Sequence, residues 1–292
     1  MEWTPKSEIL SFEEIERLSR LFVSLGVDKV RLTGGEPTLR KGVVDLVASL
    51  RSIEGLDSIL MTTNGDVLSS MVGPLRASGL NGLNVSLDTL KPDRFYEITR
   101  RNRLDRVLAG IADALAAGFE SVKINVVAMA GVNEDELCDF VDHFRNDPVE
   151  IRFIEFMPFL SNGWHKGRML TYAEMRKSIE SKYEITPIEL GDSAVAKVFD
   201  IKGAKAQVGF ITSMTDHFCS GCNRLRLTAD GRFKVCLFAK TGPSLRDAMR
   251  SGATDEEIVD TIRVALNGKW KAHPPMNRLT EVNDLPMITI GG

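Results

Sequence analysis

Three of the four cysteines of this 292-residue chain lie in one short segment, at Cys219, Cys222 and Cys236. Their spacing, C-x2-C-x13-C, offers three soft thiolates to one metal centre, because two close ligands clamp the metal and the third returns across a hairpin. Three thiolates leave one coordination position open, which favours an iron-sulfur cluster with a free iron. A structural zinc site needs a fourth ligand, and the nearby His217 keeps that alternative open.

Two arginines, Arg224 and Arg226, follow the second of these cysteines. Their alternation predicts that both lie on one face of a strand, in a hairpin over residues 225–235. In isolation such a pair is typical of a solvated strand face, but beside a cluster it favours binding of phosphate or carboxylate. The fourth cysteine, Cys138, falls in an apolar helical segment over 137–144 and is predicted to be a core residue.

Apolar, β-branched runs alternate with helical patterns through the first half of the chain. This alternation predicts βαβ units and a parallel sheet. A capping box at Ser11 and Glu14 and a glycine at Gly26 predict where the first helix begins and ends. We expect strands at 30–33, 59–63, 83–87, 122–126 and 151–156, and further helices at about 40–52, 66–79, 104–118 and 134–145.

The residues that follow these strands are the turn and ligand-binding types Gly, Asn, Asp and Pro, in the segments 34–37, 63–65, 88 and 157–158. Each loop alone reads as a simple turn. Four in succession predict a site, because ligands bind at the carboxyl edge of parallel strands. Arg31, Lys123 and Arg152 share strands with apolar neighbours, and a cation there is costly unless it meets an anion. The set therefore predicts a bound polyanion such as a nucleoside triphosphate.

The character of the sequence changes after Pro158. A polar stretch leads into a helix with a capping box at Thr171 and Glu174, and alternating runs near 195–201 and 206–212 predict a hairpin. We therefore predict two domains, 1–158 and 159–292, with the cysteine segment in the second.

Composition excludes several classes of protein. The hydrophobic fraction of 43% and the charged fraction of 26% are those of an ordinary soluble globular protein, and the net charge of -3 argues against a general nucleic-acid binder. No run approaches the roughly 20 apolar residues of a membrane span, and residues 1–10 lack the charged-then-apolar pattern of a signal peptide. We expect a cytoplasmic protein without membrane or nucleic-acid partners, whose clustered cysteines bind metal rather than form disulfides.

Several motifs together carry a resemblance to a known family. They are Arg31-Leu32-Thr33-Gly34-Gly35-Glu36-Pro37, Thr62-Thr63-Asn64-Gly65, Ser86-Leu87-Asp88, Lys123-Ile124-Asn125, Glu155-Phe156-Met157-Pro158, the C-x2-C-x13-C segment and the final Gly291-Gly292. The chain resembles the GTP 3′,8-cyclases of molybdenum cofactor biosynthesis, which are radical S-adenosylmethionine enzymes, over essentially its whole length.

The resemblance implies an α/β fold: a partial (β/α)6 TIM-like barrel missing its first strand over 1–158, and a C-terminal subdomain over 159–292 that binds a second 4Fe-4S cluster and GTP. It implies a lyase that converts GTP to (8S)-3′,8-cyclo-7,8-dihydroguanosine 5′-triphosphate through a 5′-deoxyadenosyl radical. It also implies an electron donor, a functional link to cyclic pyranopterin monophosphate synthase as the next enzyme, and a homodimer.

The site residues implied by the resemblance fall into four groups. Cys219, Cys222 and Cys236 hold the second 4Fe-4S cluster. Gly35, Ser86 and Met157 contact S-adenosylmethionine. The tail residues Gly291 and Gly292 reach into the active site, unless they are a frayed terminus. The residues that contact GTP are Arg31, Thr62, Lys123, Arg152, Arg224 and Arg226.

The sequence also departs from the family pattern. The family carries an N-terminal 4Fe-4S cluster on a C-x3-C-x2-C loop, whereas this sequence has no cysteine before Cys138. We interpret this as a truncated rather than a degenerate sequence, expect the strand near Val30 to have an exposed edge, and expect this polypeptide alone to be inactive. Two alternatives stay open: a peptide-modifying radical enzyme, which usually needs more C-terminal cysteines, and a non-catalytic module that binds metal or GTP.

Overall fold

A computed structural model describes residues 4–159, 162–191 and 193–269, together with Leu279, Pro286 and Ile290. Its internal contacts divide the chain into two compact units. The first unit comprises Met1–Ile59, Phe159–Gly163 and Asn223–Gly292, and the second comprises Leu60–Pro158 and Trp164–Cys222. Each unit is described by itself below. The domain boundary expected after residue 158 stays a prediction.

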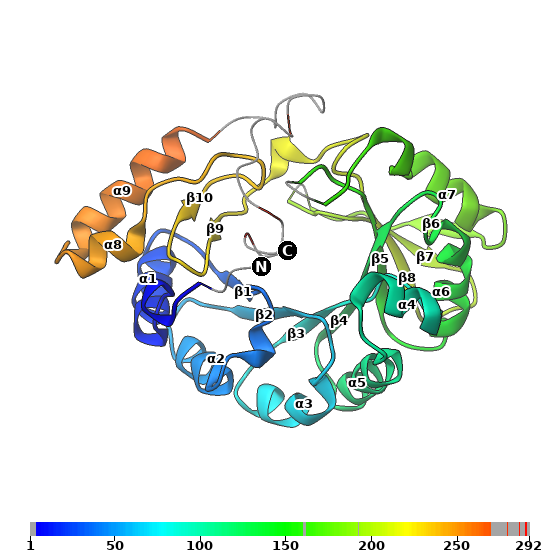
Figure 1. The fold of residues 1–292 in the computed structure, drawn as a ribbon, viewed down its shortest axis with the longest axis horizontal. Helices are drawn as coiled ribbons and strands as arrows, with labels where there is room; N and C mark the ends of the chain where they lie inside the picture. The colour runs from blue at the N-terminus through cyan, green and yellow to red at the C-terminus, as the bar shows by residue number, and fades with distance from the viewer. Residues whose placement is uncertain are drawn as a thin grey trace. The chain divides into compact units, whose positions relative to one another are not determined.

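Parallel strands form the centre of the second unit (Figure 1). Parallel pairing joins β2 to β3, β3 to β4, β4 to β5 and β5 to β8, and antiparallel pairing then adds β7 and β6. The α/β class is therefore confirmed, as is the hairpin near 195–212. The strands are β2 (Ser58–Thr63), β3 (Gly82–Ser86), β4 (Ser121–Ala128), β5 (Glu150–Glu155), β6 (Ile185–Pro187), β7 (Lys197–Ile201) and β8 (Gln207–Ile211).

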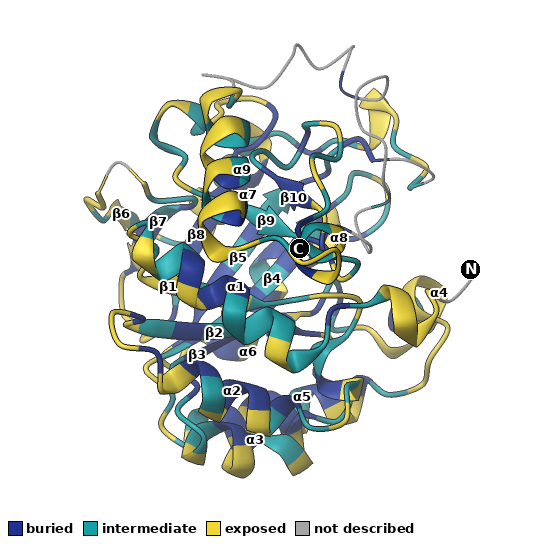
Figure 2. Ribbon diagram, turned by 90° about the vertical axis from the view of Figure 1, so that its left-hand side faces the viewer, coloured by how far each residue is buried: buried dark blue, intermediate teal, exposed yellow. Residues whose placement is uncertain are grey.

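The helices of the second unit present buried apolar faces and exposed polar faces (Figure 2). Phe140 of α6 meets Phe153 of β5 edge to face, with ring centroids 6.2 Å apart. Because side chains alternate along a strand, this contact assigns the odd-numbered residues near 153 to the helix-covered face and the even-numbered ones to the other. The helices are α3 (Leu68–Ala77), α4 (Pro92–Thr99), α5 (Leu104–Ala116), α6 (Leu137–Phe144) and α7 (Tyr172–Glu180).

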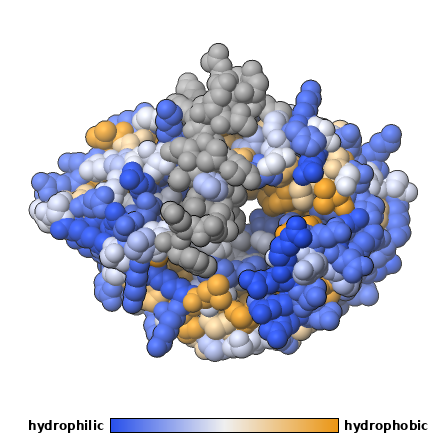
Figure 3. Space-filling model, viewed as in Figure 1, coloured by the Kyte–Doolittle hydropathy of each residue, from blue (hydrophilic) through white to orange (hydrophobic). Residues whose placement is uncertain are grey.

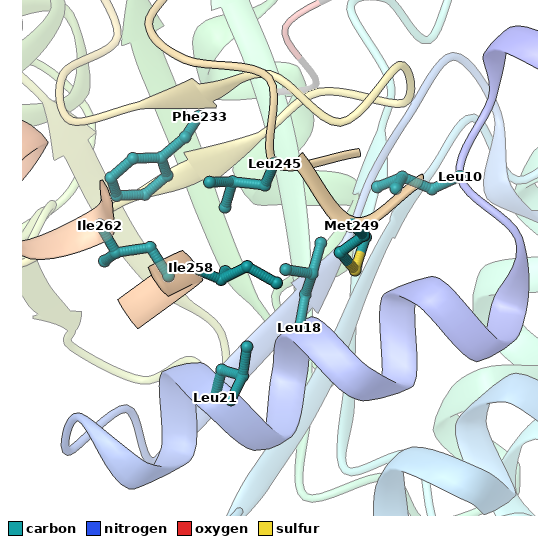
Figure 4. Close-up of a cluster of buried hydrophobic side chains, with 8 residues drawn as sticks. All are labelled: Leu10, Leu18, Leu21, Phe233, Leu245, Met249, Ile258 and Ile262. Atoms are coloured by element: carbon teal, nitrogen blue, oxygen red, sulfur yellow. The ribbon is translucent and has the colours of Figure 1, made fainter. Parts of the chain in front are cut away.

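The first unit joins the two ends of the sequence around one apolar core (Figure 4). Leu18 of α1 packs in a cluster with Phe233 of β10 and Ile258 of α9. Arg17 pairs with Asp255, which links the same two helices at the surface. The elements are α1 (Phe12–Ser24), β1 (Lys29–Leu32), α2 (Val43–Arg51), β9 (Arg226–Leu227), β10 (Phe233–Lys234), α8 (Leu245–Arg250) and α9 (Asp255–Asn267).

Helix ends follow the local sequence signals closely. The Ser11 side chain accepts a hydrogen bond from the Glu14 backbone N–H, and the Glu14 carboxylate accepts one from the Ser11 N–H. Thr171 and Glu174 form the same box at α7. Gly26 follows the first helix with φ of 93°, a left-handed conformation that glycine adopts without a Cβ clash. All three expectations are confirmed.

Other details differ from the expectations. Strand β9 begins at Arg226, so Arg224 precedes the strand and the two arginines do not alternate along it. The hairpin of β9 and β10 is present but very short, because Ala229 and Asp230 turn the chain back soon after β9 ends. Helix α4 had no sequence expectation at all. Strand β1 comes first in the strand order, with Lys29 and Arg31 exposed, in agreement with an edge strand.

The surface is largely hydrophilic in the view of Figure 3, with scattered hydrophobic patches. Such scattered patches are normal for folded proteins. Within the described residues, no helix has the length and apolar character needed to cross a membrane.

Candidate functional site

Two rows of polar side chains cross the parallel sheet of the second unit. The register aligns Thr62 of β2, Asn84 of β3, Lys123 of β4 and Glu150 of β5 in the first row. The second row, two residues further along each strand, aligns Ser86, Asn125, Arg152 and Gly209. Residues in register on parallel strands share a face, and so do residues two apart. Both rows therefore lie on the face opposite the one that the helices cover.

Two buried oxygen atoms on this face lack a hydrogen-bond partner within the described residues. They are Oγ1 of Thr62 and Oδ1 of Asn125. A buried polar atom without a partner costs about 1–3 kcal/mol, so such atoms are rare and call for an explanation. A bound ligand with hydrogen-bond donors and acceptors would satisfy both. The orphaned oxygens thus fit a polar ligand above the sheet.

The cations of the two rows share one carboxylate. Lys123 Nζ lies 2.5 Å from Glu150 Oε2, and Arg152 Nε lies 2.6 Å from Glu150 Oε1. Burial by itself would raise the pKa of Glu150, but Arg152 and Lys123 outweigh it and hold that pKa below its usual value. The group is therefore ionised at neutral pH. Lys123 and Arg152 meet a protein anion, and the three charges still sum to a net positive site.

The loop after β3, whose last residue is the S-adenosylmethionine candidate Ser86, is held in place by buried polar contacts. Asn133, which is fully buried, donates from Nδ2 to the carbonyl oxygens of Asp88 and Val127 at 2.7 and 2.9 Å. Asp88 Oδ1 accepts from the Val127 N–H at 2.8 Å. Burial raises the pKa of Asp88 to about 6, although the Val127 hydrogen bond opposes the rise. These contacts hold the carboxyl ends of β3 and β4 together.

A second buried carboxylate fixes the segment that leads to the cysteines. Glu155, at the end of β5, is fully buried and accepts hydrogen bonds from the N–H groups of Tyr172, Met214 and Thr215 at 2.9, 2.7 and 3.0 Å. The Thr215 hydroxyl also donates to it. Backbone donors stabilise a carboxylate strongly. Glu155 thus ties the start of α7 and residues 214–215 to the central sheet.

The cysteines have the chemistry of cluster ligands, and they are divided between the two units. Cys219, Cys222 and Cys236 are half-buried and form no disulfide among the described parts of the chain. Cys219 and Cys222 belong to the second unit and share a 3-10 turn, whereas Cys236 belongs to the first. In the same parts of the chain, no three His, Cys, Asp or Glu side chains are grouped to hold a metal. The donor set fits a thiolate-bound cluster, which stays a prediction.

Cys138 lies in α6 as expected but is half-buried rather than fully buried. Its Sγ lies 3.5 Å from the carbonyl oxygen of Ser178. Burial raises the pKa of the thiol. A thiol at the α6–α7 contact with a raised pKa is a packing residue and a poor nucleophile.

The candidate Met157 lies in the second unit, two residues after the end of β5, and the first unit holds the remaining candidates. Arg31 is exposed on β1. Gly35 is exposed, and a Cβ added there would meet no atom within 4 Å, so the space beside this backbone is open to a ligand. Arg224 and Arg226 are half-buried. Gly291 and Gly292 lie outside the described residues.

Comparison with known proteins gives the family. A family model described as "Molybdenum Cofactor Synthesis C" matches residues 149–275, and one described as "Radical SAM superfamily" matches residues 2–144. The chain is 47% identical to the mitochondrial GTP 3′,8-cyclase of Arabidopsis thaliana, with all of this chain and 75% of the relative covered. It is 43% identical to the GTP 3′,8-cyclase of Thermodesulfovibrio yellowstonii, with 99% of this chain and 88% of the relative covered. The chain belongs to the GTP 3′,8-cyclase family.

Some members of the GTP 3′,8-cyclase family are much longer than this chain. The chain is 48% identical to molybdenum cofactor biosynthesis protein 1 of Mus musculus, but spans only 45% of its length. Among solved structures, Streptococcus suis SuiB superposes with a TM-score of 0.61 at 15% identity, over 93% of this chain and 62% of that one. This likeness shows the fold alone, which is the α/β fold of the radical S-adenosylmethionine enzymes.

The structure adds polar residues that had no sequence assignment as site residues. In the sequence, Asn84 is a single polar residue within an apolar strand, which gives no sign of a ligand. Asn125 belongs to the motif Lys123-Ile124-Asn125, but the motif gives it no role of its own. Glu150 precedes the expected strand, so its partners across the sheet were not visible. Alternation of charge and apolar residues at Val149-Glu150-Ile151-Arg152 is the one local signal that could have revealed it.

Proposed function

We propose that this chain binds GTP and takes part in its conversion to (8S)-3′,8-cyclo-7,8-dihydroguanosine 5′-triphosphate, the first step of molybdenum cofactor biosynthesis. The observation that supports the proposal best is the polar face of the second unit, which carries Lys123 and Arg152 as well as the two orphaned oxygens. A triphosphate supplies the anion that such cations select, and a nucleoside supplies hydrogen-bond groups.

The proposal gives each candidate a role. The cations Arg31, Lys123, Arg152, Arg224 and Arg226 bind the triphosphate, and Thr62 hydrogen-bonds to the substrate. Gly35, Ser86 and Met157 contact S-adenosylmethionine. Gly291 and Gly292 act at the reacting centre. Cys219, Cys222 and Cys236 would hold a 4Fe-4S cluster, which would bind the guanine base.

The chemistry supplied by S-adenosylmethionine and an iron-sulfur cluster is the removal of the ribose 3′-hydrogen by a radical, after which C3′ joins C8 of guanine. The residues of this chain bind and orient GTP for that step. The proposal also includes an electron donor, cyclic pyranopterin monophosphate synthase as the next enzyme, and a homodimer.

Binding and metal content test the proposal. After anaerobic reconstitution we expect about four irons and four sulfides per chain. Arg226→Ala should weaken GTP binding without loss of iron, because the guanidinium meets phosphate and not the cluster. Arg263→Ala, on the exposed face of α9, is the matched control and should change neither. Loss of iron in Arg226→Ala would assign the arginine a structural role.

A non-catalytic module is the competing function. One zinc without sulfide would support it against the proposal. All cysteines of this sequence lie at or after Cys138. We therefore expect a polypeptide of these 292 residues to bind GTP without releasing 5′-deoxyadenosine from S-adenosylmethionine. Release of 5′-deoxyadenosine by this polypeptide alone would contradict that expectation.

A further inference from the structure

Glu150 contacts both cations of the polar face, Lys123 and Arg152. It begins β5, accepts from Lys123 of β4 at 2.5 Å, and accepts twice from Arg152, at 2.6 Å from Nε and 3.2 Å from Nη2. All three side chains are largely buried, with exposed fractions of 24% for Lys123, 12% for Arg152 and 10% for Glu150. We propose that Glu150 is a positioning residue, which orients Lys123 and Arg152 so that both bind the polyphosphate of the nucleotide. The inference rests on the proposed function.

The contacts with Glu150 engage only one edge of the Arg152 guanidinium. They use two of its five N–H groups. Because a carboxylate engages the Nε and Nη2 edge of Arg152, the plane of the guanidinium is set before an anion arrives. Pre-set donors lose less conformational entropy on binding.

The charge balance favours the same role. Two cations on neighbouring strands repel one another, and burying them without an anion is costly. Glu150 removes most of that cost in the ligand-free protein but neutralises only one of two positive charges. A net positive charge remains to attract a phosphate group. A cluster with no net charge would have no such preference.

Gly209 supplies a second, independent observation. It lies in β8, directly across from Arg152. A Cβ added at Gly209 would lie 2.9 Å from Glu150 Oε1 and 3.5 Å from Arg152 Cγ. Glycine inside a strand weakens it and marks a close approach of another group. The missing side chain therefore makes room for the carboxylate where it contacts Arg152.

This geometry allows a test that separates position from charge. Glu150→Gln removes the charge and keeps the shape. Gly209→Ala keeps the charge and displaces the carboxylate, because the added Cβ would lie 2.9 Å from Glu150 Oε1. The Cβ of Ala196, 3.3 Å from the added atom, would also have to shift slightly. Glu184→Gln is the matched control: it removes a carboxylate from an exposed pair with Lys202 in the same unit. Each full-length variant is measured by calorimetry with GTP, inorganic triphosphate and guanosine, and by thermal unfolding.

If Glu150 positions the cations, Glu150→Gln raises the dissociation constants of GTP and inorganic triphosphate by roughly tenfold, and Gly209→Ala raises them by several-fold. Guanosine binding stays unchanged, because guanosine carries no phosphate. The double variant binds no more weakly than Glu150→Gln, since both changes remove the same interaction. A variant with general structural damage would lose guanosine binding as well.

The opposite results overturn the inference. Tighter binding of triphosphate by Glu150→Gln, with Gly209→Ala unchanged, would show that Glu150 only competes with the ligand. Equal binding by all variants would show that it has no role in binding. If the wild type binds inorganic triphosphate but not GTP, the proposed function fails while Glu150 is still tested. If the wild type binds neither, both proposals fall.

Discussion

The two ends of strand β5 each carry a buried glutamate, and the two are held in different ways. Glu150 contacts two charged side chains, whereas Glu155 accepts hydrogen bonds from three backbone N–H groups. Backbone donors are fixed by the fold, so Glu155 joins parts of the chain. Side-chain cations can rearrange around a second anion, so Glu150 belongs to a region that can respond to a ligand. The nature of the partners separates a structural carboxylate from a functional one.

The largest expected effect is at Glu155. Glu155→Ala leaves the N–H groups of Tyr172, Met214 and Thr215 without their acceptor, and should lower the free energy of unfolding by about 3–5 kcal/mol. Denaturant unfolding followed by circular dichroism measures the loss. Glu155→Gln keeps one oxygen acceptor and should fall between the alanine variant and the wild type. A loss in Glu155→Ala no larger than that in Glu150→Gln would remove the contrast between the two ends of β5.

The variant Asp88→Asn tests whether one backbone hydrogen bond can offset the cost of burying a carboxylate. Its pKa is raised from 3.8 to about 6, so the folded protein binds this proton more tightly than the unfolded chain. Stability is therefore lost as the pH rises from about 3.8 to 6, and the penalty persists above that range. Asp88→Asn should raise the unfolding free energy by about 1–3 kcal/mol at pH 7.

We expect the gain in the unfolding free energy to be about 1 kcal/mol, the lower end of about 1–3 kcal/mol, because Asp88 is only half-buried. Unfolding curves at pH 4 and pH 7 make the measurement, and the two proteins should converge near pH 4. An Asp88→Asn variant that is less stable than the wild type at pH 7 would show that the Val127 hydrogen bond outweighs the cost of burial.

Glu150 should show a smaller effect with the opposite dependence on pH. Its pKa lies below the usual 4.5, so its contribution to stability is present above that pH and is lost as the pH falls through the lowered pKa. Glu150→Gln should cost about 1 kcal/mol at pH 7, because the amide oxygen of the variant can still accept hydrogen bonds from Lys123 and Arg152. Wild type and variant should become equally stable in acid. A constant difference at all pH values would point to packing instead of charge.

The smallest effect is expected at the exposed pair of Glu184 and Lys202, whose side chains are 67% and 73% exposed. Water and salt screen such a pair almost completely. Glu184→Gln should leave both the unfolding curve and triphosphate binding unchanged within experimental scatter. A measurable change in either would mean that altered net charge alone can produce part of the Glu150→Gln result.

Much of the fold could be predicted from the sequence. The strands of the parallel sheet, both hairpins and the capping boxes at Ser11 and Thr171 were visible, because periodicity and capping depend on residues a few positions apart. Helix α4 was missed because its few apolar residues make a weak pattern over eight residues. The pairing of β8 with β5 was also missed, since parallel pairing joins strands that are distant in sequence.

Less of the candidate site could be predicted. Lys123 and Arg152 were recognised as cations in apolar strands, and the structure places them beside one carboxylate. Arg224 was expected in a strand but precedes it, because a two-residue strand carries no reliable alternation. The assignments of Gly35, Ser86, Met157 and the cysteines to cofactors remain part of the proposed function.

The sequence alone determined the α/β class, the capped starts of α1 and α7, the family and the chemical types of the candidate ligands, because each depends on short-range patterns or motifs. Only the tertiary structure decided that Glu150 lies between Lys123 and Arg152, and that Gly209 leaves room for its carboxylate. These residues meet through the register of neighbouring strands, and that register is set by the packing of the whole sheet against its helices. No local pattern carries that information.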